Sequence, residues 1–146
     1  MVLVIKLIII GIDFGDSRTG MAKLNTDFPI ATPLPTIKCR DINQIADKAA
    51  DMIKEYNGKR VVLGLPLNMD GSHGPRADKV KLFASLLNER IPVQIDFNDE
   101  RLTSAYAHSI MNITDTSGKK RKESVDAAAA TIILQSYFDK NKSLFE

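Results

Sequence analysis

The chain has 146 residues, of which 44% are hydrophobic and 26% are charged, and its formal net charge is +2. This composition is typical of one globular domain over residues 1–146 that can bury a full core, and it leaves little room for a second domain. No stretch is long and apolar enough to cross a membrane, and the small net charge does not by itself indicate nucleic-acid binding. The single cysteine, Cys39, excludes an internal disulfide. Together with the lack of a recognisable signal peptide, the single cysteine favours the reducing cytoplasm as the expected location.

The segment Leu7–Gly20, LIIIGIDFGDSRTG, organises the predicted fold. Leu7–Ile12 is apolar apart from Gly11 and rich in β-branched residues, which predicts a central strand covered on both faces. Asp13 ends this run, and a carboxylate there needs a cation, hydrogen-bond donors or water to compensate its charge. Two interpretations stay open: a group that handles metal or phosphate with Arg18 nearby, or an aspartate that caps its own turn.

The next elements in chain order are a hairpin and a helix. Gly20–Asn25 is predicted to return as a hairpin strand. Pro29–Lys38 contains three prolines, so any strand there should lie at a sheet edge with interrupted pairing. Apolar residues at helical spacing predict a helix over Ile42–Asn57, with Asp41 as its N-cap and Gly58 as its stop.

A buried strand, a second helix and a third strand follow. Arg60–Leu65 reads as a buried strand, and Leu67–Gly74 as a loop. Pro75 suits the first turn of a helix that ends near Asn88. Pro92–Phe97 is predicted to form a third short core strand.

The last part of the chain is predicted to be mainly helical. Ser104–Met111 can form a short helix, and the polar, basic segment Asn112–Lys122 is predicted to be a mobile loop. Ser124 is expected to cap a helix over Val125–Lys140. The helical crossovers imply that the later strands run parallel to the first. The fold class is therefore α/β, with a mixed five-stranded sheet and helices on its faces.

Acidic residues follow the strand ends. Because parallel strands end at the same edge of a sheet, Asp13, the loop after Leu65 and the segment Asp99–Thr103 should converge. Asp126, in the first turn of the predicted last helix, could join them. Clustered carboxylates repel one another unless a divalent cation lies between them, and oxygen ligands favour Mg²⁺ or Mn²⁺. Such an ion can align a phosphodiester and activate water.

Four consecutive cations, Lys119–Lys122, precede Asp126 in the sequence. Beside a metal site they would attract a nucleic-acid backbone. Taken alone, the same run is typical of a solvated loop. Its position just before Asp126 favours the nucleic-acid interpretation.

Four spaced segments resemble a known family: GIDFGDSRTGMA, VVLGLPLNMDGSHGPRA, NDERLTSAYA and KKRKESVDAAAATIILQSYF. From about Leu7 to Phe138 the chain is similar to the YqgF/RuvX family of RNase H-like Holliday junction resolvases, which is also assigned to maturation of pre-16S ribosomal RNA. The resemblance implies a three-layer RNase H-like fold. It implies acidic site residues that would be catalytic and would bind the metal, namely Asp13, Glu100 and Asp126. With the basic run added, the expected nucleic-acid contacts are Arg18, Arg101, Thr103, Lys119, Lys120, Arg121 and Lys122.

Other polar residues are weaker candidates. Asp99 is the rival of Glu100, because adjacent strand residues point to opposite faces and only one can enter the cleft. Asp70 is more typical of a turn than of a site. His73 and His108 have no partner visible in the sequence and are expected to be structural or exposed.

The function expected from these features is a metal-dependent endonuclease acting on precursor ribosomal RNA or on branched DNA. We expect a cytoplasmic protein that is a monomer or homodimer and has no membrane partner. One alternative is a nucleic-acid-binding module with little or no turnover, acting in ribosome biogenesis, translation or transcription. Another is an ATP-using phosphotransferase of the actin or sugar-kinase type, but the chain has the length of one lobe and no later glycine-rich adenosine loop.

Overall fold

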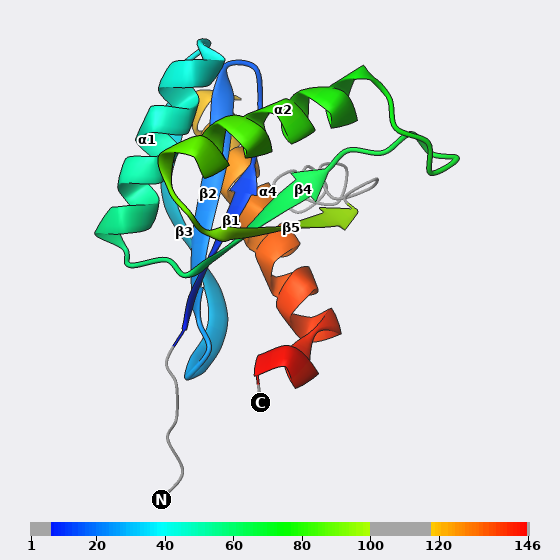
Figure 1. The fold of residues 1–146 in the computed structure, drawn as a ribbon. Coiled ribbons are helices and arrows are strands. Elements are labelled where there is room, and N and C mark those ends of the chain that lie inside the picture. The colour runs from blue at the N-terminus through cyan, green and yellow to red at the C-terminus, as the bar shows by residue number, and fades with distance from the viewer. Residues whose placement is uncertain (1–6, 100–117, 146) are drawn as a thin grey trace, which may run out of the picture.

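The computed structural model describes residues 7–99 and 118–145, and over residues 118–127 it describes only the backbone. These residues form one five-stranded sheet in the order β3-β2-β1-β4-β5, together with three α-helices and a short 3-10 helix (Figure 1). The elements are β1 (Ile8–Asp13), β2 (Arg18–Asn25), β3 (Phe28–Lys38), α1 (Ile42–Glu55), β4 (Arg60–Leu65), α2 (Pro75–Arg90), β5 (Gln94–Asp99), α4 (Gly118–Lys140) and η1 (Lys142–Phe145).

The sheet is mixed, as predicted. β1 and β2 form an antiparallel hairpin, and β3 pairs antiparallel to β2 at one edge with two register shifts. β4 runs parallel to β1, and β5 runs parallel to β4. Since Ile12 pairs with Leu63 and Leu65 pairs with Asp99, the carboxyl ends of the three parallel strands lie side by side.

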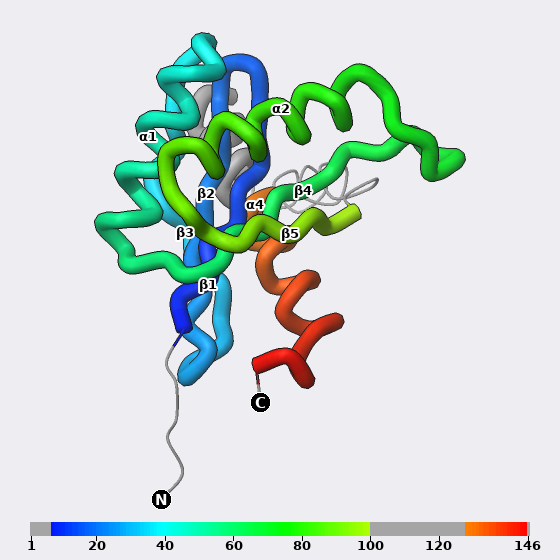
Figure 2. The backbone as a smooth tube through the Cα atoms, in the orientation of Figure 1, coloured from blue at the N-terminus to red at the C-terminus, as the bar shows by residue number. Residues whose placement is uncertain are grey.

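The sheet is the middle of three layers, with α1 and α2 on one face and α4 on the other (Figures 1 and 2). Side chains of β1 alternate between the two cores: Ile10 and Ile12 pack with the α1 and α2 side chains, whereas Ile9 packs with those of α4. This double burial explains why the β1 sequence is a nearly continuous apolar run.

The approach of α4 to the sheet depends on small residues. A Cβ atom added at Gly11 would lie 2.7 Å from the Cβ atom of Leu134 and 3.0 Å from the carbonyl oxygen of Ala130. Ala130 belongs to the core between α4 and the sheet, and Ala129 is also buried. Glycine on β1 and alanine on α4 therefore bring helix and strand into close contact.

The predicted start of α1 is confirmed, and its end differs slightly. The Oδ1 atom of Asp41 accepts a hydrogen bond from the Gln44 amide at 3.0 Å, which satisfies a free donor of the first turn. The helix ends at Glu55, and Asn57, rather than Gly58, takes the left-handed conformation with φ of 58°. Gly58 instead allows close packing, since an added Cβ atom would lie 2.7 Å from Cγ1 of Ile10.

The prediction for the start of the last helix was wrong. α4 begins at Gly118, so Lys119–Lys122 belong to the helix and Ser124 lies inside it instead of capping it. Lysine, arginine and glutamate have high helix propensity, and this preference prevails over the polar, loop-like appearance of the segment. The predicted helix 104–111 and residues 112–117 of the predicted loop lie outside the described residues.

The prediction of a third core strand also needs correction. β5 spans Gln94–Asp99, two residues later than expected, and it forms the second edge of the sheet. The side chain of Phe97 is 42% exposed, and the α4-facing side of the strand carries the charged residue Asp96. Within the described ranges no helix is long and apolar enough to span a bilayer.

Candidate active site

Asp13 is the last residue of the central strand β1, where it pairs with Gly20 of β2 and is half-buried. Strand alternation places Asp13 on the same sheet face as Ile9 and Gly11, which is the face covered by α4. The chain therefore holds a carboxylate at the carboxyl end of its most central strand, which is the predicted position.

The turn after Asp13 is held by its own residues. The Gly15 amide donates a hydrogen bond to Oγ1 of the fully buried Thr19 at 3.4 Å, and that hydroxyl donates to the Gly15 carbonyl at the same distance. A Cβ atom at Gly15 would lie 2.1 Å from the Arg18 carbonyl oxygen, so the turn requires glycine. The ring of Phe14 stacks on that of Phe83 with centroids 4.6 Å apart, which fastens the turn to α2.

Asp16 binds the same turn to the beginning of α2. Its carboxylate lies 2.5 Å from Nζ of Lys79 and 3.6 Å from Nη1 of Arg76. The hydrogen bond and charge of Lys79 lower the pKa of Asp16, burial raises it less, and the charge of Arg76 lowers it further. These residues line a hollow of about 220 Å³ together with Phe14 and Pro75. Asp16 was not among the predicted site residues, and two cations already neutralise its charge.

The end of β5 distinguishes between the two acidic candidates there. Ile95 packs with the α1 and α2 core, whereas Asp96 contacts Tyr137 of α4. By alternation, Asp99 lies on the α2 side of the sheet, opposite to the face that carries Asp13. This arrangement disfavours Asp99 as the partner of Asp13. Glu100, Arg101 and Thr103 lie outside the described residues.

The backbone of α4 brings position 126 toward the level of Asp13. α4 runs in the opposite direction to β1 (Figure 1). Asp126 precedes Ala130 by one helical turn, and the Ala130 carbonyl lies over Gly11, two residues before Asp13. The expectation that Asp126 lies in the first turn of the helix was wrong, because α4 begins at Gly118. The helix dipole is therefore not the reason for a carboxylate at this position.

A basic pocket opens beside the same hairpin. Arg18, the first residue of β2, pairs with Lys38, the last residue of β3. With Ser17, Cys39 and Arg40 these two residues line a pocket of about 440 Å³. Arg18 was predicted, but Lys38 and Arg40 were missed. The only sequence signal for them was the basic cluster that surrounds Cys39.

The remaining candidates do not extend this site. Asp70 accepts hydrogen bonds from the Ser72 amide at 2.9 Å and the Ser72 hydroxyl at 2.6 Å, and Gly71 has φ of 86°, which supports the turn interpretation. His73 is exposed, and His108 lies outside the described residues. Among the side chains that the structure describes, no three His, Cys, Asp or Glu residues gather as a metal site. That set excludes Glu100 and Asp126.

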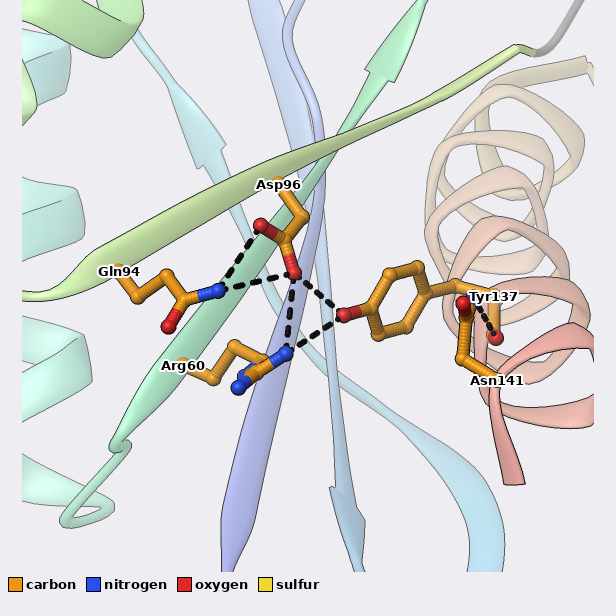
Figure 3. A network of polar contacts seen from close by, with 5 residues as sticks. All are labelled: Arg60, Gln94, Asp96, Tyr137 and Asn141. Atoms are coloured by element: carbon orange, nitrogen blue, oxygen red, sulfur yellow. Dashed lines mark hydrogen bonds and ion pairs between the residues drawn. The ribbon is translucent and has the colours of Figure 1, made fainter. Parts of the chain in front are cut away.

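The opposite end of the α4-covered face carries a polar network that the sequence did not predict (Figure 3). Tyr137 donates a short hydrogen bond to Oδ2 of Asp96. Nη1 of Arg60 donates to that oxygen at 3.2 Å and to the Tyr137 hydroxyl at 3.0 Å. Gln94 adds a hydrogen bond of 3.2 Å to the other carboxylate oxygen. Burial, and then the hydrogen bond to Asp96, raise the pKa of Tyr137.

This network joins β4, β5 and α4 at the amino ends of the parallel strands. The side chains of Arg60 and Asp96 are only 21% and 28% exposed, so the pair is better shielded than a surface ion pair. The Arg60 guanidinium also lies 5.2 Å from the ring centroid of Phe145. Each charged group in the network has a partner within it, which is the pattern of a structural contact.

Comparison with known proteins gives relatives along nearly the whole chain. A protein in Caldanaerobacter subterraneus subsp. tengcongensis is 38% identical over 136 residues, which cover 92% of this chain and 98% of the relative. A protein in Heliobacterium modesticaldum is 37% identical over 131 residues, covering 90% and 88% of the two chains. Both relatives carry the name "Putative pre-16S rRNA nuclease".

Solved structures show a similar fold at low sequence identity. RuvC of T. thermophilus, solved in complex with a Holliday junction substrate, superposes with a TM-score of 0.57 at 12% identity, covering 92% of this chain and 95% of RuvC. The fowlpox virus resolvase, solved with Holliday junction DNA, gives a TM-score of 0.58 at 13% identity, covering 96% and 100%. The predicted RNase H-like fold is thereby confirmed.

The model of the RuvX family, described as Holliday junction resolvase, matches residues 7–140. This range includes every strand of the sheet, α1, α2 and all of α4. Together with the two relatives above 30% identity, the match shows that the chain belongs to the RuvX family.

Proposed function

We propose that this protein is a metal-dependent endonuclease that acts on structured nucleic acid, with Asp13, Glu100 and Asp126 as its catalytic and metal-binding residues. The observation that carries the proposal is the position of Asp13. Its half-buried carboxylate ends the central strand, next to the carboxyl ends of the other two parallel strands. Open α/β sheets bind ligands at this edge.

The donor set fits a hard divalent cation. Asp13, Glu100 and Asp126 would supply only carboxylate oxygens, which suit Mg²⁺ or Mn²⁺. When bound, such an ion activates water and stabilises the leaving oxygen of a phosphodiester. The protein would fix Asp13 rigidly, because the turn after it is anchored through Thr19 and Phe14.

Two kinds of substrate fit the comparisons. The names of the relatives indicate precursor 16S ribosomal RNA, and the two solved neighbours are complexes with a Holliday junction. We propose cytoplasmic action on one of these two substrates. The backbone would be held by Arg18, Arg101, Thr103 and the cations Lys119–Lys122. Support for the last group comes from α4, whose first turns lie at the end of the sheet where β1 ends (Figure 1).

A catalytically weak nucleic-acid-binding module is the second candidate, since the same basic residues would serve binding alone. Family membership favours both nucleic-acid functions over the ATP-using phosphotransferase. Turnover separates the nuclease from the binding module.

The test is incubation of the purified protein with a precursor 16S RNA fragment and with a four-way DNA junction, in Mg²⁺, in Mn²⁺ and in chelator. The proposal predicts cleavage of one substrate with either metal and none in chelator. Binding without cleavage in both metals would support the binding module. Full cleavage in excess chelator would contradict the metal mechanism.

A further inference from the structure

The pocket between the β1–β2 turn and the end of β3 gathers three cations. It is lined by Ser17, Arg18, Lys38, Cys39 and Arg40, and its volume is about 440 Å³. Among the side chains that the structure describes, those that line the pocket include no aspartate or glutamate. The backbone joins its two walls, because the Cys39 amide donates a hydrogen bond to the Ser17 carbonyl at 3.1 Å. The pocket is therefore part of the ordered end of the sheet.

Its two strand residues form a like-charge pair in register. Arg18 of β2 lies directly opposite Lys38 of β3. Like charges at opposed positions of an antiparallel pair are unfavourable, since their Cβ atoms are only about 4.5–5.5 Å apart. Arg40 adds a third positive charge at the same pocket. Within the described residues neither arginine forms an ion pair. An anion in the pocket would be attracted by the positive charges of Arg18, Lys38 and Arg40 together.

The pair lies on the same side of the sheet as Asp13. Thr19 and Ile37 are buried neighbours of Arg18 and Lys38, and Ile37 packs into the α1 and α2 core. By alternation, Arg18 and Lys38 lie on the face covered by α4. Arg18 is two residues from Gly20, the partner of Asp13, so it is a diagonal neighbour of Asp13 at about 7–8 Å. Cations at this spacing can hold a backbone phosphate adjacent to the reacting one.

We infer that Lys38 and Arg40, together with Arg18, form a binding pocket for one backbone phosphate of the nucleic-acid substrate, beside the phosphodiester that is cut. This inference rests on the proposed function and adds Lys38 and Arg40 to it. The lining residues that the structure describes offer cations, a hydroxyl and a thiol, so the pocket binds the sugar–phosphate backbone and does not read base sequence.

The first test measures the salt dependence of binding. The double variant Lys38→Ala/Arg40→Ala is compared with the parent on one RNA hairpin and one DNA junction, in Ca²⁺ to limit cleavage. Losing one phosphate contact should lower the slope of log K against log salt by about one and weaken binding about eightfold near 0.1 M salt. The loss should be the same for substrates of different sequence.

The matched control is Lys140→Ala/Lys142→Ala, which removes the same total charge from two exposed residues, the last of α4 and the first of η1. Its slope should stay at the parental value. If both variants lost the same amount of salt slope, net charge alone would explain the effect, and the pocket inference would be contradicted. A parental slope in Lys38→Ala/Arg40→Ala would overturn it as well. Circular dichroism and thermal melts verify that each variant is folded.

A second test uses Cys39, the one cysteine of the chain and a lining residue of the pocket. Its half-exposed thiol lies 3.4 Å from Oε1 of Gln44 and can be alkylated with iodoacetamide. Saturating nucleic acid should slow alkylation several-fold in the parent. The protection should be lost in Lys38→Ala/Arg40→Ala at equal occupancy. An unchanged alkylation rate in the saturated parent would place the backbone elsewhere and overturn the inference.

The outcomes separate this inference from the function beneath it. If the parent binds and cleaves, but the pocket variant keeps the parental salt slope and the Cys39 thiol stays reactive, only the pocket inference is contradicted. A parent that shows both pocket effects but does not cleave overturns the nuclease and retains the pocket. A parent that binds neither RNA nor DNA overturns both.

Discussion

The two ends of the α4-covered sheet face differ in how their charged residues are arranged. We call the end with Arg60, Asp96 and Tyr137 the structural end, and the end with Asp13, Arg18 and Lys38 the functional end. At the amino ends of the parallel strands, a cation and a carboxylate meet: Arg60 and Asp96 bind each other and the Tyr137 hydroxyl. At the carboxyl end of β1, two cations stand in register, Arg18 against Lys38, near the carboxylate of Asp13. Opposite charges that pair within the chain stabilise the fold, whereas several cations gathered around one pocket can bind an anionic ligand.

The largest expected effect concerns the acidic residues at the functional end. Glu100→Gln and Asp126→Asn should each lower the cleavage rate about a hundredfold or more, since each removes a preorganised group that the reaction needs. Asp99→Asn is the matched control and should cut at nearly the parental rate, because Asp99 lies on the α2 side of the sheet. Single-turnover cleavage assays measure all three. If Asp99→Asn lost most of its cleavage rate while Glu100→Gln kept it, Asp99 rather than Glu100 would be the site residue.

The second prediction concerns the basic first turns of α4. Replacing Lys119, Lys120, Arg121 and Lys122 with alanine should keep the helix, since alanine is the strongest helix former. Binding should weaken, and the slope of log K against log salt should fall by as much as about four if all four residues contact phosphates. A salt titration of binding measures this slope. An unchanged slope would mean that these cations are only solvated. The nucleic-acid contacts would then come from the β1–β2 hairpin and not from α4.

The third prediction tests the structural end. Tyr137→Phe removes a hydroxyl that donates to Asp96 and accepts from Arg60, which should lower the free energy of unfolding by about 1–2 kcal/mol. The cleavage rate of the folded protein should not change. Urea denaturation measures the loss. The control is Tyr56→Phe, which keeps the ring that lies 5.0 Å from Nζ of Lys23 and should shift stability by less than about 0.5 kcal/mol. If both variants lost the same free energy of unfolding, the loss in Tyr137→Phe could not be attributed to the network.

The smallest expected effect is an alkaline pH dependence at the same end. Burial and the hydrogen bond to Asp96 raise the pKa of Tyr137 above its ordinary value of 10.0. The unfolded chain then loses this proton at lower pH than the folded chain does, so the contribution is fully present below pH 10 and is lost as pH rises through the raised pKa. Unfolding free energies of the parent and of Tyr137→Phe should therefore converge at high pH. A constant difference across this range would contradict the raised pKa.

Local patterns made much of the fold predictable from sequence. The β1 run, the Asp41 cap of α1 and the strand Arg60–Leu65 depend on neighbouring residues, and the structure confirms all three. The start of α4 was missed because a serine before an apolar stripe resembles a cap, whereas the helix propensity of lysine and arginine favours a longer helix. The edge position of β5 was missed because strand order is not encoded in local periodicity.

The site was predictable only in part, for the same reason. Asp13 could be selected as a candidate because its charge interrupts an apolar run, and Arg18 because it follows closely in the same hairpin. Lys38 could not be identified, because its pairing with Arg18 depends on a register that shifts along β2 and β3. The contact between Arg60 and Tyr137 joins residues 77 positions apart, and no spacing rule predicts it.

The most direct measurement applies the same substitution at both ends. Asp13→Asn and Asp96→Asn each remove one negative charge with little change of shape, and each variant is melted in chelator and assayed for cleavage in Mg²⁺. Asp13→Asn should be at least as stable as the parent, because carboxylate repulsion falls, and should cut about a hundredfold more slowly or worse. Asp96→Asn should lose about 1–2 kcal/mol, because Arg60 loses its counter-charge, and should cut at the parental rate per folded molecule. If Asp13→Asn melts clearly earlier yet cuts normally, Asp13 is a structural cap and the carboxyl end of β1 is not the active site.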